Sequence, residues 1–147
     1  MSRARDSFSS IYTINFVPFA RAALFVIYFW FGAVKLTGLS QASPLAQALV
    51  ENTVGGQYFH TLFIILAILE CVIGILFLIP RLTKVAFIAL LIHMLIVCSP
   101  LIFVPAMSWQ YFLIPTIEGQ YIIKNLALLA LALAITNDYV ARQKRLK

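Results

Sequence analysis

The chain has 147 residues, of which 63% are hydrophobic and only 11% are charged, and its formal net charge is +6. Soluble domains are nearer half apolar and about a quarter charged, so this composition excludes an ordinary soluble fold and predicts an integral membrane protein. The positive charge does not indicate nucleic-acid binding, because the basic residues flank apolar runs and form no basic patch interleaved with aromatic residues. The length fits one compact bundle, so we expect a single domain over residues 1–147.

Four apolar runs follow one another, and each is long enough to cross a bilayer as a helix. The first covers residues 16–36. A basic segment precedes it, as in a signal peptide, but no clear cleavage site ends it and three more runs follow, so we expect a retained helix. The other three runs cover residues 61–79, 85–104 and 121–137. Together they predict an all-α, integral membrane four-helix bundle with up-down-up-down topology.

The connections between these runs differ in length and character. Residues 37–60 form a long loop whose segment PLAQALVENT has helical spacing, so we expect a short helix on the membrane surface. Residues 80–84 form a tight basic turn. Residues 105–120 form a second long connection, which carries Trp109 and Tyr111, residue types that favour the level of the lipid head groups.

The distribution of Lys and Arg predicts the orientation, because these residues are enriched in cytoplasmic segments. One side of the predicted bundle, which includes both chain ends and the short turn, carries Arg3, Arg5, Arg21, Arg81, Lys84, Arg142, Lys144, Arg145 and Lys147. The opposite side carries only Lys35 and Lys124. This asymmetry places both termini in the cytoplasm.

The second apolar run contains one full charge, Glu70, near its centre. A carboxylate at mid-membrane depth is costly, so it usually has a partner or a function. Helical spacing then identifies polar and small residues that share one face on each helix. In chain order, the face of the first helix consists of Arg21, Phe25, Tyr28, Gly32 and Lys35, and that of the second of Ala67, Glu70 and Gly74. The face of the third helix consists of Ala86, Ala89, His93 and Val97, and that of the fourth of Ala127, Ala130 and Ala134.

The expected depth of each residue, at about 1.5 Å of rise per helical residue, divides the polar residues into three levels. Tyr28, Glu70 and His93 lie near mid-membrane, and Arg21 lies near the inner surface as an anchor. A predicted outer charged cluster, near the opposite surface, consists of Lys35, Glu118 and Lys124. Glu118 offers Lys124 an ion pair, while the alternative for both lysines is a side chain that extends along the apolar surface to the interface.

Two interpretations of Tyr28, Glu70 and His93 stay open. The functional one is a buried site that handles protons or binds a quinone head group, since histidine exchanges protons near neutral pH. In the structural one, Glu70 and His93 satisfy each other and fix the helix register, and Tyr28 only packs. The sequence contains no His/Cys cluster that indicates a metal, and no nucleophile triad, phosphate-binding loop or dinucleotide motif.

Three segments together resemble a known family. RAALFVIYFWFGAVKLTG in the first helix, LECVIGILFLI in the second and EGQYIIKNLALLALAL entering the fourth are similar to DoxX-like membrane proteins. The closer similarity is to the YkgB-type inner-membrane branch, which also has an SPL segment after the first helix. The recurring elements of the family fall here on Arg21, on Gly32 with Lys35, on Glu70 with Gly74, and on Lys124.

The resemblance implies a multi-pass four-helix protein of the bacterial inner membrane. Some family members are associated with quinone-linked sulfur oxidation or membrane redox complexes, and the YkgB-type branch is linked to tolerance of reactive chlorine and related oxidants. This chain looks shorter than YkgB-type proteins in its first outer loop, which puts any function of that loop in doubt.

Three functional hypotheses follow. The first is a redox-linked or oxidant-tolerance component that binds a quinone or a similar small apolar molecule between its helices and works with a membrane or soluble redox partner. The second is a transporter of protons or a small solute, which would need a homo-oligomer because four helices are few. The third is a non-catalytic scaffold in which the charges only specify packing.

Overall fold

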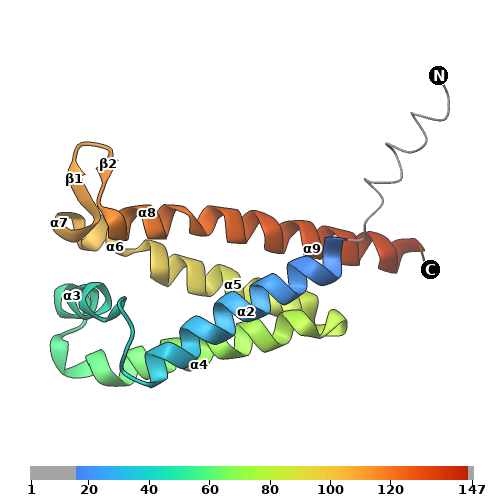
Figure 1. Ribbon diagram of the computed structural model, residues 1–147, viewed down its shortest axis with the longest axis horizontal. Helices are drawn as coiled ribbons and strands as arrows, with labels where there is room; N and C mark the ends of the chain where they lie inside the picture. Colours follow the sequence, from blue (N-terminus) through green and yellow to red (C-terminus); the bar gives the residue numbers. More distant parts are fainter. Residues whose placement is uncertain (1–15, 146–147) are drawn as a thin grey trace.

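The computed structural model describes residues 16–145 of the chain. Four helical segments in this range are long and apolar enough to span a membrane, namely Phe16–Leu36, Gly56–Leu78, Pro80–Phe103 and Ile117–Arg145. They pack side by side as a bundle (Figure 1). This confirms the predicted all-α bundle of four membrane-spanning helices.

The bundle has one end with basic residues and one end with the long connections. The first helix, α2 (Phe16–Leu36), begins at the same end at which the last helix, α9 (Asn125–Arg145), finishes (Figure 1). We call this the inner end and the opposite one the outer end. Within the described residues, the inner end carries Arg21, Arg81, Lys84, Arg142, Lys144 and Arg145. Arg3, Arg5 and Lys147, which also entered the predicted orientation, lie outside the described residues.

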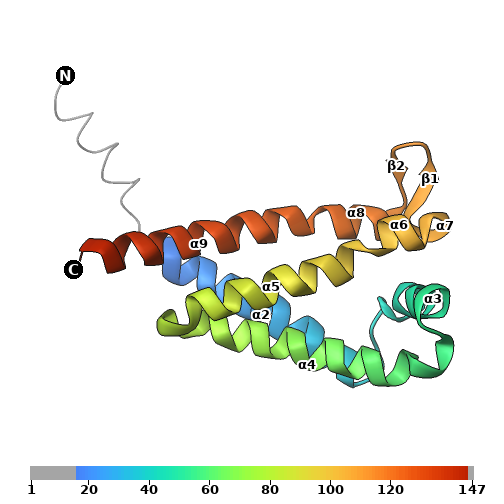
Figure 2. The same ribbon diagram turned by 180° about the vertical axis from the view of Figure 1, so that it is seen from behind.

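The first half of the bundle follows the predicted boundaries closely. Helix α2 spans the predicted residues 16–36. The second spanning segment begins with a 3-10 turn, η1 (Gly56–Tyr58), and continues as α4 (Phe59–Leu78). Between them, α3 (Ser43–Thr53) lies at the outer end (Figure 2), which confirms the expected short helix. A proline near its first turn favours that start, since its missing N–H would be unpaired there anyway.

The second half differs more from the predicted boundaries. After a 3-10 turn, η2 (Pro80–Leu82), α5 runs over Thr83–Cys98 and is followed by α6 (Pro100–Phe103). The last spanning segment consists of α8 (Ile117–Ile123) and α9, with a break at Lys124. The prediction that this helix ends near residue 137 is wrong. The basic tail contains no glycine or proline, and Arg142 bonds Asp138 at 2.8 Å, a spacing of four residues that supports the helix.

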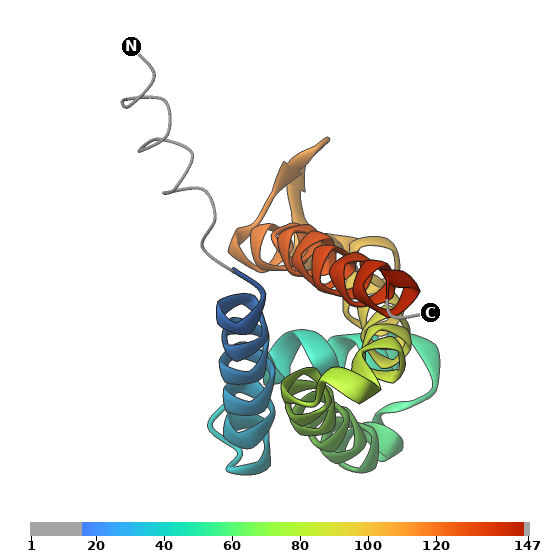
Figure 3. The same cartoon turned by 90° about the vertical axis from the view of Figure 1, so that its right-hand side faces the viewer.

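A small hairpin extends the outer end of the bundle. Helix α7 (Pro105–Ser108) leads into strand β1 (Trp109–Tyr111), which pairs antiparallel with β2 (Ile114–Pro115). Seen from the inner end, the hairpin projects away from the helices (Figure 3). The indole Nε1 of Trp109 donates to the carbonyl of Leu101 at 2.9 Å, which attaches the hairpin to the end of the third span.

The core and the outer surface of the bundle are both apolar. Fully buried side chains come from all four long helices and include Leu24, Ala67, Ile73, Phe77, Ala86, Leu90, Ala132 and Ile135. Large apolar side chains also face outward, such as Phe19 and Leu95, which are 84% and 76% exposed. A soluble monomer rarely exposes apolar surface of this extent, whereas lipid tails cover it without cost.

Two glycines bring α2 and α4 into direct backbone contact. A Cβ added at Gly32 would lie 2.6 Å from the carbonyl oxygen of Ala67 and 2.7 Å from Sγ of Cys71. A Cβ at Gly74 would lie 3.0 Å from the backbone nitrogen of Phe29. Small residues at such positions let membrane helices approach closely. This contact sets the register of α2 against α4.

The predicted face of α9 is wrong. Ala127 and Ala130 are exposed and Ala134 is only half-buried, and the buried residues of α9 are instead Ala132, Ile135 and Thr136. Leucines at 128, 129 and 131 pack against the core. Large leucine side chains therefore fill the space between α9 and its neighbours, and α9 needs no stripe of small residues for close approach.

Candidate intramembrane polar site

Glu70 is the centre of a polar site built from three helices. Its Oε2 accepts a hydrogen bond from Nζ of Lys35 on α2 at 2.6 Å. Its Oε1 lies 2.9 Å from Nε2 of His93 on α5. Glu70 and His93 are only 5% and 3% exposed. The site thus joins α2, α4 and α5 through one buried carboxylate, and both carboxylate oxygens have a partner.

The position of Lys35 corrects the predicted outer charged cluster. Its ammonium pairs with Glu70 and does not join Glu118 and Lys124. The α2–α4 contact at Gly32 and Cys71 puts the Cα of Lys35 about one turn further out than Glu70. Helical side chains lean toward the N-terminus of their own helix, so Lys35 leans toward the middle of α2 while Glu70, on an antiparallel helix, leans outward to meet it.

The other two members of the predicted outer cluster have different surroundings. Lys124 lies at the break between α8 and α9, and its Nζ is 3.7 Å from the centre of the Tyr121 ring, a cation–π contact. Glu118 lies in the first turn of α8. The ion pairs found among residues 16–145 involve Glu70 and the Arg142–Asp138 pair, so the expected Lys124–Glu118 pair is absent from this part of the chain.

Tyr28 contacts the site through its ring. The ring meets the imidazole of His93 edge to face, with centroids 5.4 Å apart and planes at 77°. Tyr28 is 4% exposed. Aromatic pairs favour this geometry, so Tyr28 restricts the rotation of the His93 ring. The structure therefore brings Tyr28, Glu70 and His93 together, and Lys35 joins them.

The hydrogen bond with Glu70 decides which nitrogen of His93 carries hydrogen. A carboxylate only accepts hydrogen bonds, so Nε2 of His93 donates to it. In a neutral imidazole the other nitrogen, Nδ1, is then an acceptor. Nδ1 is buried and has no hydrogen-bond partner among the described residues. Most buried polar atoms are paired, so Nδ1 of His93 is an exception among the described residues.

An apolar cavity of about 450 Å³ lies beyond this site toward the outer end. It is lined by residues of α3, α4, α5 and α6. Leu66 and Ile96 in its wall lie about one turn outward of Glu70 and His93 on the same helices, and Leu69 is adjacent to Glu70 in sequence. The cavity therefore lies about one helical turn outward of the polar site, and Lys35, Glu70 and His93 are not among its lining residues.

Arg21 occupies a separate polar site at the inner end. Its Nη1 donates to the carbonyl of Phe77 at 2.9 Å, and its Nη2 donates to the hydroxyl of Thr83 at 2.8 Å. It is 8% exposed. Arg21 therefore connects α2 to the end of α4 and the start of α5.

Sequence reasoning missed both acceptors of Arg21, and no strong signal could have found them. The carbonyl of Phe77 is one of the last of α4, which lack helical partners in any sequence. Thr83 follows a basic turn and looks like an ordinary helix start.

For metal binding, no group of three or more His, Cys, Asp or Glu side chains lies close together within residues 16–145.

Comparisons with known proteins return no match to this chain. No protein-family model matches it, and no curated protein and no solved structure is significantly similar to it. The described residues form a multi-pass membrane bundle with a buried Lys35–Glu70–His93 group at its centre.

Proposed function

We propose that this protein binds a small apolar molecule with a polar head group, of the quinone and quinol class, at the Lys35–Glu70–His93 site. The single observation that carries the proposal is the buried Nδ1 of His93, which has no hydrogen-bond partner within residues 16–145. Its partner nitrogen is bonded to Glu70, so the imidazole cannot turn to satisfy Nδ1 without losing that bond.

The chemistry of the site fits a head group that bears a hydroxyl. Nδ1 of a neutral His93 accepts a hydrogen bond, and a quinol hydroxyl donates one. When Nδ1 holds a proton, the imidazolium is next to the Glu70 carboxylate, and a quinone carbonyl becomes the matching acceptor. The same nitrogen therefore suits both forms of such a ligand, with the proton held on His93 or on the ligand.

The apolar cavity outside the site supports the same class of ligand. Ligand sites are mostly apolar with a few polar groups that fix orientation. The cavity of about 450 Å³ reaches to within a turn of Glu70 and His93. It offers space for the apolar part of a molecule whose head group contacts Nδ1.

The resemblance to DoxX-like proteins supports a redox-linked role, and the YkgB-type similarity supports tolerance of oxidants. A quinone supplies two-electron redox chemistry when it is bound. In this proposal the chain binds and orients the head group and holds a proton at Nδ1. A membrane or soluble partner supplies or takes the electrons.

Two substitutions at one position test the proposal. The amide nitrogen of glutamine occupies about the place of Nε2 in histidine, whereas that of asparagine is closer to Nδ1. His93→Gln should therefore keep the bond to Glu70 and lose the ligand contact. His93→Asn should lose the bond to Glu70.

The measurement is the shift in Tm of the purified protein on titration with a short-chain ubiquinol and ubiquinone. We expect the wild type to be stabilised, His93→Gln to fold with little stabilisation by either form, and the exposed control His60→Gln to behave as wild type. Equal stabilisation of wild type and His93→Gln would refute a ligand contact at Nδ1.

A purely structural role is the second candidate, because both oxygens of Glu70 already have partners within the bundle. Under this alternative, His93→Gln is as stable as the wild type, and quinol shifts the Tm of neither protein. The titration therefore separates the two candidates directly.

A further inference from the structure

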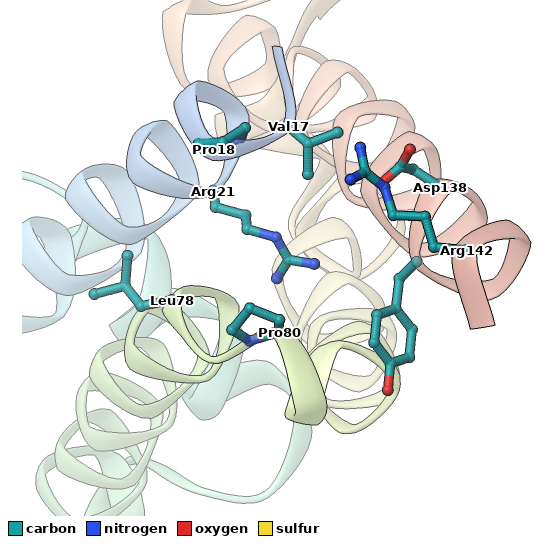
Figure 4. Close-up of a pocket in the computed structure, with 8 residues that line it drawn as sticks. Val17, Pro18, Arg21, Leu78, Pro80, Asp138 and Arg142 are labelled. Carbon is teal, nitrogen blue, oxygen red and sulfur yellow. The ribbon is translucent and has the colours of Figure 1, made fainter. Parts of the chain in front are cut away.

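A second cavity, of about 420 Å³, lies at the inner end of the bundle, away from Glu70. It lies between the start of α2, the turn after α4 and the inner part of α9 (Figure 4). Its lining residues are Val17, Pro18, Arg21, Leu78, Pro80, Asp138, Tyr139 and Arg142. Lys35, Glu70 and His93 are not among them.

The polar side of the cavity is positively charged. It contains two arginines, Arg21 and Arg142, and one carboxylate, Asp138, so the lining has a net charge of +1. Arg142 Nε bonds Asp138 at 2.8 Å. Figure 4 shows the guanidinium of Arg21 between α2 and the residues of α9 that line the cavity. Its two hydrogen bonds hold it in place and use two of the five N–H groups of a guanidinium.

The opposite side of the cavity is apolar and open toward the surface of the bundle. Pro18, Leu78 and Pro80 are exposed side chains in its wall. All three lie at the inner ends of the membrane-spanning segments. A ligand there would have its charged part on the arginines and its apolar part against a surface that lipid tails contact.

We propose that this cavity binds the phosphodiester head group of an anionic phospholipid from the inner leaflet. Guanidinium groups recognise phosphate oxygens in bidentate geometry, and basic pockets between membrane helices on the cytoplasmic side suit anionic head groups. Arg81, which adjoins Pro80, and Lys84 add positive charge at the same end. The apolar wall favours a lipid over a free phosphate ion, since a free ion gains nothing from it.

The test is the binding of phosphatidylglycerol to the delipidated full chain in detergent, measured by native mass spectrometry with phosphatidylcholine as the neutral comparison. We expect phosphatidylglycerol to bind more tightly than phosphatidylcholine. Arg142→Gln should weaken the binding of phosphatidylglycerol about fivefold, which is the effect of one basic residue near a membrane surface. The control Lys144→Gln removes the same charge from the same end of α9 but from outside the cavity lining, and it should bind as the wild type does.

A third variant gives an effect of opposite sign. Asp138→Asn keeps an oxygen for the bond from Arg142 and raises the net charge of the lining by one, so it should bind phosphatidylglycerol more tightly. Equal losses in Arg142→Gln and Lys144→Gln, or no loss in either, would overturn the proposed site. Competition by inorganic phosphate that removes the lipid completely would overturn the choice of a lipid. Far-UV circular dichroism of each variant confirms that it is folded.

Discussion

The ammonium of Lys35 and the carboxylate of Glu70 form a 2.6 Å ion pair between the outer end of α2 and the middle of α4. Both side chains are less than a tenth exposed. Glu70 in turn bonds His93 on α5. One carboxylate therefore fixes the relative positions of three helices, and removing either neighbour changes the environment of the other.

Lys35→Met should destabilise the bundle by about 2 kcal/mol, because it takes the charged partner from a buried carboxylate. The cost stays below the ~3–5 kcal/mol of a fully unpaired buried charge, since His93 still donates to Glu70. Unfolding in mixed micelles with increasing denaturing detergent measures it. Lys124→Met serves as the matched control, because it removes a lysine whose contact is the Tyr121 ring, and it should cost less than about 1 kcal/mol.

The double variant Lys35→Met/Glu70→Gln tests whether the two residues act as a pair. We expect a coupling energy of about 1–2 kcal/mol, within the range seen for residues in direct contact. Strictly additive effects of the two single variants would contradict the ion pair as a stabilising contact.

The fold of this chain was predictable because long apolar runs have few alternatives in a bilayer. Helix α2 has the boundaries that its hydropathy indicates. The last helix does not, because its final turns carry polar residues, and hydropathy marks where a helix leaves the membrane but not where it ends. The continuation to Arg145 depends on helix propensity and on the Asp138–Arg142 pair.

Three members of the site were also predictable, but the fourth, Lys35, was not. Periodicity and depth group Tyr28, Glu70 and His93, and the structure brings these three together. Residue spacing groups Lys35 with the outer charges, because it gives the depth of the Cα alone. The crossing of α2 over α4 and the lean of a helical side chain decide where its ammonium lies, and neither can be read from residue spacing.

Gly32→Ala should destabilise the bundle by about 1–3 kcal/mol, the usual cost of overpacking. The added methyl would meet the carbonyl oxygen of Ala67 at 2.6 Å, and a backbone atom cannot move aside without shifting a helix. Unfolding in mixed micelles measures this cost. Gly74→Ala, whose nearest contact is 3.0 Å, should cost less. If Cys71→Ala restored the stability of Gly32→Ala, the clash with Ala67 would be refuted as the main cause.

The charge asymmetry predicts a definite orientation that chemical labelling can check. In a background without Cys71 and Cys98, a cysteine at Gln57 should react with a membrane-impermeant maleimide added to intact cells, because η1 lies at the outer end. A cysteine at Lys144 should react only after the cells are permeabilised, because α9 finishes at the basic inner end. The reverse pattern would show that both chain ends face outward.

Thr83→Val should destabilise the inner end of the bundle by about 1–3 kcal/mol, because it leaves a buried guanidinium group without one of its acceptors. The hydroxyl of Thr83 accepts from Arg21 Nη2 at 2.8 Å and donates to the carbonyl of Pro80 at 2.7 Å. Valine has nearly the same shape, so the loss measures these hydrogen bonds and not the packing. Thr83→Ser keeps the hydroxyl and should retain most of the stability in the same unfolding assay. A Thr83→Val variant as stable as the wild type would argue against a stabilising hydrogen bond from Arg21.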